Sequence, residues 1–411
     1  MKKQLNNLLF LSSCTVAILM LTASAIPEKT GINLPSWGFF AHKRINRLAV
    51  LTLPPEMMVF FKKHIDFIAD HAVDPDMRRY ATRLEGARHF IDLDQYGTPP
   101  FENLPRNWSD ALIRHTDIRV VDSKGDTMLL VDHRDTMTPV FRQEYRKWFR
   151  QSVVPAFYSG NHEVNPDSVF RFFSDWGRLD TRPADAFFQE YISGHGILPW
   201  NLQHFQQKLT DAFRERDARL ILKLSAEIGH YIGDAHVPLH TCSNYNGQKT
   251  GQHGIHGFWE SRIPELFADE SYDYFVGKPV YIENTRDWFW QCALDSHSMV
   301  DSVLSIEKAL RESFPADRQM CPDMRQGIMG IHPCREFASA YQEALDGMVE
   351  RRMRAAIVAV SSAWYTAWAN AGQPDLSGLN AGTPNQQELE EEQTVRNAFA
   401  LGKIFGRTEE H

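Results

Sequence analysis

The sequence lacks a second long apolar run, has few cysteines and carries no excess of positive charge. Beyond residues 8–21, no stretch is long and apolar enough to span a membrane, which takes roughly 20 residues. Lysine and arginine number 44 against 52 aspartates and glutamates, which gives a formal net charge of −8. Because an acidic chain binds phosphate backbones poorly, we expect no stable nucleic-acid partner.

The N-terminus is typical of an export signal. Two lysines precede the apolar run of residues 8–21, and Ala23 and Ala25 then form a small-x-small cleavage pattern. We therefore expect a signal peptide over residues 1–25 and an exported mature protein, periplasmic or secreted, with no transmembrane anchor after processing. A membrane anchor left in place and a lipoprotein signal at Cys14 are the alternatives.

Cysteine is scarce, and four of the 5 cysteines lie beyond the expected signal peptide. An even number of cysteines in an exported protein suggests two disulfides. Cys321 and Cys334 are close in sequence and form the first expected pair, which leaves Cys242 with Cys292. The sequence alone permits three pairings.

Helical periodicity dominates the remainder of the chain. Apolar residues spaced three and four apart predict helices over residues 43–51, 55–69, 202–214, 217–237, 286–313 and 335–371. The expected fold class is therefore mostly all-α. One multi-helix domain over residues 37–372 is the simplest organisation.

Three segments depart from the helical pattern. Residues 96–110 contain glycine and several prolines and are predicted to form a loop. Residues 117–133 predict a β-hairpin that turns around Gly125. The acidic tail, residues 373–411, is expected to be weakly ordered or a peripheral helix.

The stretch HYIGDAHVPLH, residues 230–240, carries the strongest chemical signal. His230 and Asp234 lie four residues apart on a predicted helix and so share one face. Periodicity alone favours a solvated polar stripe. Gly229 and Gly233 argue against it, because a glycine inside a helix costs about 0.8–1 kcal/mol relative to alanine. Close approach of another backbone would explain both glycines.

Two further features indicate a metal site. Pro238 cannot continue the helix, so the chain turns where His240 must face back toward Asp234. The run HGIHGFWE then places His256 and Glu260 four residues apart on another helical face. Imidazole and carboxylate are the ligands that zinc takes from a protein in the absence of cysteine thiolates.

These motifs together resemble the zinc-dependent phospholipase C superfamily, which also contains the single-strand-specific nucleases of fungi and plants. That family builds a trinuclear zinc site from an N-terminal Trp, a nearby His, an Asp with a His about fifteen residues later, H-x3-D-x5-H, and H-x3-(E/D). All of these elements occur here in order: Trp37, His42, Asp74, His89, His230, Asp234, His240, His256 and Glu260.

The resemblance implies a multi-helix domain that binds up to three zinc ions. Asp74, His89 and His230 would hold the first ion, and Asp234 would bridge it to the second. Asp74 and Asp234 would be the catalytic residues, with Asp74 orienting the attacking water. Asp76 competes with Asp74 for this position, although the spacing to His89 favours Asp74.

The second zinc ion would be bound by His42 and by the main chain of Trp37. The family uses a free α-amino group there, so residues 26–36 would have to be a pro-segment that is removed after Ser36. Without that cleavage the second ion would be weakly bound or absent. A third, more open ion would be held by His240, His256 and Glu260.

The function implied by the resemblance is that of an exported zinc-dependent hydrolase, which cleaves phosphodiester bonds with a metal-activated hydroxide. Zinc would make the site cationic, so the acidic net charge does not exclude an anionic substrate. Glu260, in place of the Asp usual in nucleases, and the short spacing from His240 to His256 favour a phospholipid head group. Single-stranded nucleic acid is the alternative substrate, and a non-catalytic zinc-stabilised binding protein is the alternative of another class. About residues 109–190 resemble an insertion relative to the nucleases.

Overall fold

The computed structural model describes residues 39–102, 104–325, 328–405 and 407. These residues are mostly helical and include two small antiparallel sheets, which confirms the predicted mainly α-helical class. Within them, no helix is long and apolar enough to cross a membrane. The predicted signal peptide (1–25), the pro-segment (26–36) and Trp37 lie outside the described residues.

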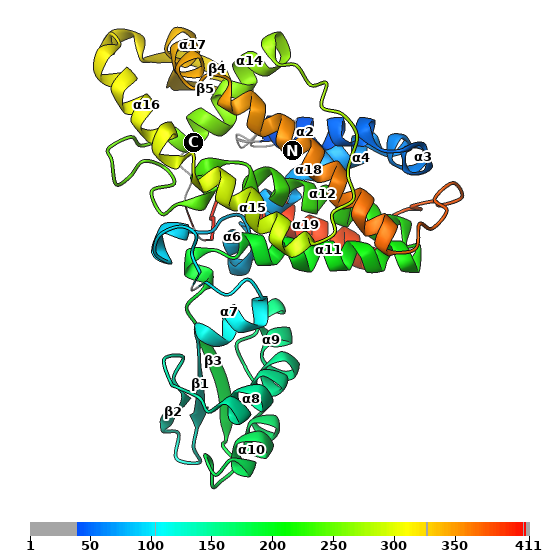
Figure 1. The fold of residues 1–411 in the computed structure, drawn as a ribbon, viewed down its shortest axis with the longest axis vertical. Coiled ribbons are helices and arrows are strands. Elements are labelled where there is room, and N and C mark those ends of the chain that lie inside the picture. The colour runs from blue at the N-terminus through cyan, green and yellow to red at the C-terminus, as the bar shows by residue number, and fades with distance from the viewer. Residues whose placement is uncertain (1–38, 103, 326–327, 406, 408–411) are drawn as a thin grey trace, which may run out of the picture. The chain divides into compact units, whose positions relative to one another are not determined.

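Elements from both ends of the sequence build the helical part of the molecule (Figure 1). The N-terminal elements are α2 (Phe39–Thr52), α3 (Pro55–Lys63), α4 (Ile65–Asp70), η1 (His71–Val73), α5 (Asp74–Arg78), α6 (Arg83–Arg88) and η2 (Leu93–Gln95). The later elements are η3 (Ser193–His195), α11 (Leu198–Glu215), α12 (Ala218–Ala235), η4 (Pro238–Thr241), α13 (Ile255–Gly257), the π-helix η5 (Phe258–Arg262), α14 (Ile263–Ser271), α15 (Thr285–His297), α16 (Val300–Ser313), η6 (Ala316–Arg318), α17 (Arg335–Ala344), α18 (Met348–Asn370) and α19 (Gln386–Ala400).

Helix α12 packs against α2, α11 and α18 and forms part of the largest apolar cluster. The side chain of Asp217 caps its N-terminus by accepting a hydrogen bond from the N–H of Leu220. Residues 224–235 of the helix are all buried. Polar side chains in this stretch therefore need partners inside the protein, and the solvated-stripe interpretation is wrong.

Three predicted helices are each divided in two. The division between α3 and α4 falls at His64, and that between α15 and α16 falls at residues 298–299. Between α17 and α18, Asp346 and Gly347 have φ angles of 49° and 71°, in the left-handed region that ends a helix. Apolar periodicity continues across all three divisions, which explains why the sequence does not reveal them.

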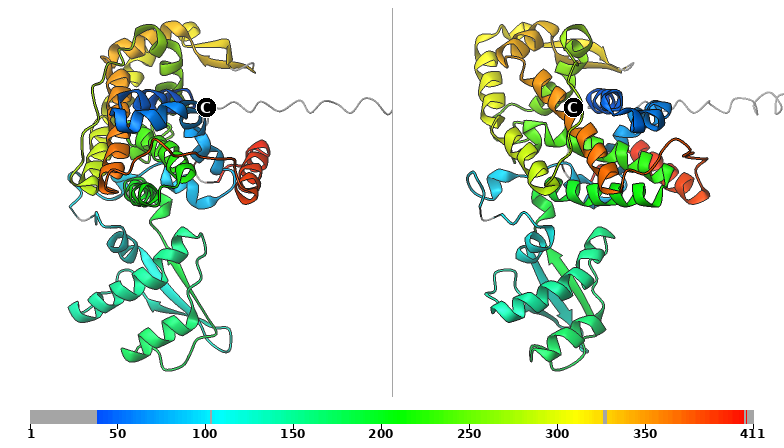
Figure 2. Two further views of the ribbon diagram at one scale, coloured as in Figure 1. Left: turned by 90° about the vertical axis from the view of Figure 1, so that its right-hand side faces the viewer. Right: turned by 45° about the vertical axis from the view of Figure 1, so that its right-hand side comes forward.

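The predicted hairpin is confirmed, and a third strand extends it. Strands β1 (Thr116–Val121) and β2 (Thr127–Val131) turn at Gly125, where φ is 91°, and β3 (Asp185–Glu190) pairs with the other edge of β1. Figure 2 shows helices on one face of this sheet. These helices are α7 (Trp108–Arg114), α8 (Pro139–Ser152), α9 (Val154–Tyr158) and α10 (Pro166–Asp175).

The second sheet is the hairpin of β4 (Met320–Arg325) and β5 (Ile328–Pro333). A disulfide joins Cys321 to Cys334 at its base, as predicted. The predicted pair of Cys242 and Cys292 is wrong, because both thiols are free. They are buried in different apolar clusters, so the even count of cysteines was misleading.

The tail forms a surface helix, α19, that contributes no buried residue. Its first turn is fixed by a capping box between Asn385 and Glu388. Polar and edge contacts attach it to the helical part, including the ion pair of Arg219 with Glu388.

Candidate metal centre

Side chains from separate segments converge beside the C-terminal half of α12. Three groups of imidazoles and carboxylates each place their ligand atoms within 4.8 Å of one another. Because such donors could hold metal ions, we call these residues together the metal cluster. The first group is Asp76, His89 and His230, the second is His42, His230 and Asp234, and the third is His240, His256 and Glu260.

The two glycines of α12 allow α2 to approach closely. A Cβ atom added to Gly233 would lie 2.8 Å from Nδ1 of His42, and one added to Gly229 would lie 2.0 Å from Oδ1 of Asn46. The side chain of Asn46 donates to the Ala226 carbonyl at 3.0 Å and is fully buried. The glycines therefore have the expected purpose, although side chains of α2 rather than its backbone fill the space.

The Asp234 carboxylate lies at the centre of the cluster. Its Oδ1 is 3.4 Å from Nε2 of His42 and 3.7 Å from Nε2 of His240. Its Oδ2 is 3.0 Å from Nδ1 of His89 and 3.3 Å from Nε2 of His230. The two oxygens thus face different sets of imidazoles, which is the arrangement that a bridging carboxylate requires.

The two imidazoles of the first group, His89 and His230, each direct one ring nitrogen toward the same point. Nε2 of His230 lies 3.0 Å from Nδ1 of His89. Nδ1 of His230 donates to the Ala72 carbonyl at 2.8 Å, since a carbonyl oxygen can only accept. The lone pair of His230 is therefore on Nε2 and points into the cluster, as a metal ligand requires.

The structure brings Asp76 into the first group in place of the predicted Asp74. Oδ1 of Asp76 lies 3.7 Å from the ligand nitrogens of both His89 and His230. Oδ2 of Asp74 instead lies 2.7 Å from Nδ1 of His71. Residues two apart on a helix point about 200° away from each other, so only one of the two aspartates can face the cluster. Spacing in the sequence could not decide between them.

In the third group, Oε2 of Glu260 is 3.3 Å from Nε2 of His240 and 2.9 Å from Nε2 of His256. Its Oε1 reaches Nε2 of His42 at 3.2 Å, which connects this group to the second. Nδ1 of His256 donates to the Tyr245 carbonyl at 3.1 Å, so its Nε2 also faces inward.

Glu260 lies in the π-helix η5, an element that is rare and frequently found at functional sites. Arg262 of the same element donates to the Pro333 carbonyl and forms an ion pair with Asp323 at 2.6 Å. The disulfide-closed hairpin therefore anchors the segment that carries Glu260.

Burial sets the electrostatics of the cluster. Burial raises the pKa of Asp234 above its ordinary value, against the opposing effects of His240 and His42. Burial also opposes ionisation of Glu260, but the imidazoles of His240, His256 and His42 hold its pKa well below the ordinary value. Each ion pair found for these two carboxylates is with a histidine. A buried carboxylate is costly unless it is paired or binds a metal, so the donor set fits a divalent cation.

An ionic network that the sequence analysis missed lies behind His89. Glu85 is buried and accepts hydrogen bonds from Arg88 at 2.8 Å and from Arg78 at 3.3 Å, and it also accepts from Tyr231. Its Oε1 is 3.8 Å from Nε2 of His89. Glu85 precedes His89 by four residues, the spacing that also relates His256 to Glu260, and this signal could have revealed it.

A fourth group, Asp117, Asp132 and His133, lies in the segment of the three-stranded sheet. Oδ1 of Asp117 accepts from the backbone and the ring of His133, and its Oδ2 accepts from Tyr191 at 2.9 Å and from Arg119. Because these bonds occupy the carboxylate, the group is better explained as a fixed turn than as a metal site.

Two cavities differ in chemistry. One of about 20 Å³ lies between the metal cluster and α18, has room for about one water, and is lined by His42, Glu260 and His236 among others. His236 donates from Nδ1 to the Ile232 carbonyl at 2.7 Å.

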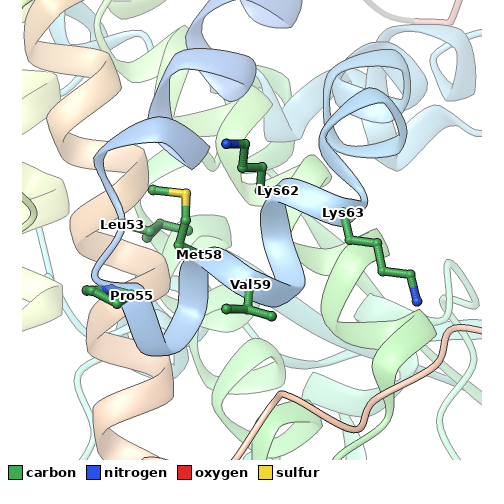
Figure 3. A pocket seen from close by; sticks show the side chains of 6 residues that line it. All are labelled: Leu53, Pro55, Met58, Val59, Lys62 and Lys63. Carbon is green, nitrogen blue, oxygen red and sulfur yellow. The ribbon is translucent and has the colours of Figure 1, made fainter.

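The second cavity, of about 480 Å³, is an open concavity at α3 (Figure 3). No carboxylate or imidazole lines it, since the lining residues are Leu53, Pro55, Met58, Val59, Lys62 and Lys63.

The predicted set of ligands thus comes together in the described residues with one exchange, Asp76 for Asp74, while Trp37 lies outside those residues. Comparisons of the chain with models of protein families, with curated proteins and with solved structures find no match.

Proposed function

We propose that the protein is an exported zinc-dependent phosphoesterase of the phospholipase C type. The observation that carries the proposal is the Asp234 carboxylate, whose two oxygens face different sets of imidazoles. A carboxylate in this position can bridge two cations. Paired cations about 3.5–4 Å apart are typical of sites that hydrolyse phosphodiester bonds.

The donor set favours zinc over magnesium and calcium. Those two cations prefer oxygen ligands, whereas each group of the metal cluster contains at least one imidazole. Structural zinc sites are closed by four protein ligands, while catalytic sites keep a position open. The assignment by ion is as follows: Asp76, His89 and His230 for the first, His42 and Asp234 for the second, and His240, His256 and Glu260 for the third.

When bound, zinc would supply Lewis-acid chemistry that stabilises charge on phosphate oxygens and makes hydroxide available near neutral pH. The side chain of Asp76 is 19% exposed, against 1% for Asp234 and 8% for Glu260. Asp76 is therefore the most exposed of these three cluster carboxylates. We assign to Asp76 the role predicted for Asp74, which is to accept a hydrogen bond from the attacking water and orient it.

Aromatic burial favours a phospholipid head group over nucleic acid. Single-strand binding without sequence preference uses exposed aromatic faces on which bases stack. Tyr231, Phe258 and Trp259 adjoin predicted ligands in the sequence, and all three are buried. The alternative function is that of a single-strand-specific nuclease. Assays with both kinds of substrate distinguish it from our proposal.

Two neighbouring aspartates provide a matched test. Asp76→Asn removes a cluster carboxylate, so we expect turnover of bis-p-nitrophenyl phosphate to fall by about a hundredfold. Asp74→Asn breaks the contact with His71 and should keep turnover within about twofold of wild type. Parallel assays with phosphatidylcholine micelles and single-stranded DNA identify the substrate. A wild-type protein inactive on all three substrates, or a loss confined to Asp74→Asn, contradicts the proposal.

A further inference from the structure

Phe405 and Arg407 lie close to the metal cluster, far from its ligands in the sequence. The N–H of Phe405 donates to the Arg79 carbonyl at 2.9 Å, and Nη2 of Arg79 donates to the Arg407 carbonyl at 2.8 Å. Nη1 of Arg79 also lies 3.8 Å from Oδ1 of Asp76. Arg79, which binds Phe405 and Arg407, is therefore also in contact with a cluster carboxylate.

The side chain of Arg407 is fixed by three other residues. Its guanidinium pairs with the buried carboxylate of Asp92, and its central carbon lies 3.4 Å from the Phe90 ring centroid and 4.5 Å from that of Tyr245. An arginine stacked on aromatic rings and paired with a carboxylate is held more firmly than an exposed ion pair.

These partners adjoin the cluster on two sides. Phe90 follows His89 directly in the sequence, and the Tyr245 carbonyl accepts the hydrogen bond that orients His256. Arg79 thus contacts Asp76 of the first group directly. Arg407 contacts Phe90, which follows His89 of the first group, and Tyr245, whose carbonyl binds His256 of the third group. The exposed fractions of His89 and His256 are only 1% each.

We propose that Phe405 and Arg407 form a strap that covers the metal cluster and must be displaced before a phosphodiester, or a metal exchanging with solvent, can reach it. The substrate part of this inference rests on the proposed function, whereas the metal-exchange part does not. Displacement would uncover the buried Phe90 ring beneath Arg407, but it would remove no buried residue of α19, and the linking residue Leu401 is already 83% exposed.

The attachment of the strap combines charge and stacking. The pair of Arg407 with Asp92 is charged and largely buried, with side chains 14% and 5% exposed. Salt screens such pairs much less than exposed ones. Higher ionic strength should therefore change the opening rate only weakly, whereas Arg407→Ala removes both the ion pair and the stacking on Phe90 and Tyr245.

Metal exchange provides the test. The zinc-loaded full-length protein, Arg407→Ala and a chain ending at Leu401 are mixed with a chromophoric chelator, and the rate of zinc transfer is recorded. We expect transfer to be about tenfold faster in both variants, the equivalent of about 1.4 kcal/mol. Turnover of bis-p-nitrophenyl phosphate should rise in parallel. Arg396→Ala is the matched control, because Arg396 pairs with Glu392 on the exposed surface of α19.

Each outcome decides the question. Faster transfer in Arg407→Ala and the shortened chain, with an unchanged control, supports the strap. Equal transfer rates in all proteins overturn it, as does faster transfer that appears equally in Arg396→Ala. If Arg407→Ala lowers the melting temperature, its transfer rate reports unfolding as well as opening of the strap. The transfer rate of the chain that ends at Leu401 is then the deciding measurement. If no phosphodiester is hydrolysed, the proposed function fails while the zinc-transfer rates still test the strap.

Discussion

At the scale of single residues, the metal cluster depends on side chains that fix the direction of its ligands. The Ala72 carbonyl orients His230 and the Tyr245 carbonyl orients His256, each through Nδ1. His89 faces the cluster through Nδ1, and Glu85 lies behind its Nε2. Such outer partners contribute strongly to metal affinity because they hold the ligand in its binding orientation.

Glu85→Gln tests this role. The substitution takes from the partly buried Arg88 its carboxylate partner and leaves Arg78 with Glu227 alone, and we expect the free energy of unfolding to fall by about 3 kcal/mol. Loss of the group behind His89 should weaken zinc binding by about tenfold. Tyr231→Phe, which removes one hydrogen bond to Glu85, is the control with a smaller expected effect. Denaturant unfolding and zinc competition measure both quantities, and unchanged zinc affinity in Glu85→Gln would refute the role.

At the scale of elements, the site depends on how closely α2 and α12 approach. His42 reaches the cluster because Gly233 has no side chain to exclude its ring. The imidazole is rigid and buried, so a methyl group 2.8 Å from Nδ1 and 3.0 Å from Cε1 could be accommodated only by displacing the ring.

Gly233→Ala should therefore be destabilising, although alanine favours a helix by about 1 kcal/mol over glycine. We expect a lower melting temperature and loss of the zinc bound by the second group, seen in thermal unfolding and metal analysis. Gly378→Ala is the matched control, because nothing lies within 4 Å of a Cβ atom at that position. A Gly233→Ala protein with increased stability and full zinc content would exclude the close approach as the reason for this glycine.

The way in which these elements pack also explains which features the sequence could predict and which it could not. Helices, the hairpin at Gly125 and the i, i+4 ligand pairs are local patterns, and the sequence reveals them. The choice of Asp76 over Asp74 depends on the rotation of the short helix α5, which spacing does not define. The predicted pairing of Cys242 with Cys292 was wrong because the number of cysteines says nothing about the distance between them in the fold. The hydrogen bond of Arg79 with Arg407 joins residues more than three hundred positions apart, for which no local signal exists.

At the scale of the whole molecule, segments from His42 to Glu260 supply the cluster, and Arg407 packs on Phe90, the residue that follows His89. The groups bury several carboxylates among imidazoles in a chain whose net charge is −8. Divalent cations would relieve the cost of burying those carboxylates, so metal binding and the stability of the fold should be coupled.

The proposed function depends above all on the binding of several cations that Asp234 would bridge. The most direct measurement is the zinc content of the purified protein by atomic-emission spectrometry, compared with that of Asp234→Ala. We predict two to three zinc ions per chain in the wild type and at least one fewer in the variant, because Asp234 belongs to the second group and its Oδ2 also faces His89 and His230 of the first. A wild-type protein that retains a single ion or none, or an Asp234→Ala protein with undiminished zinc, would contradict the account.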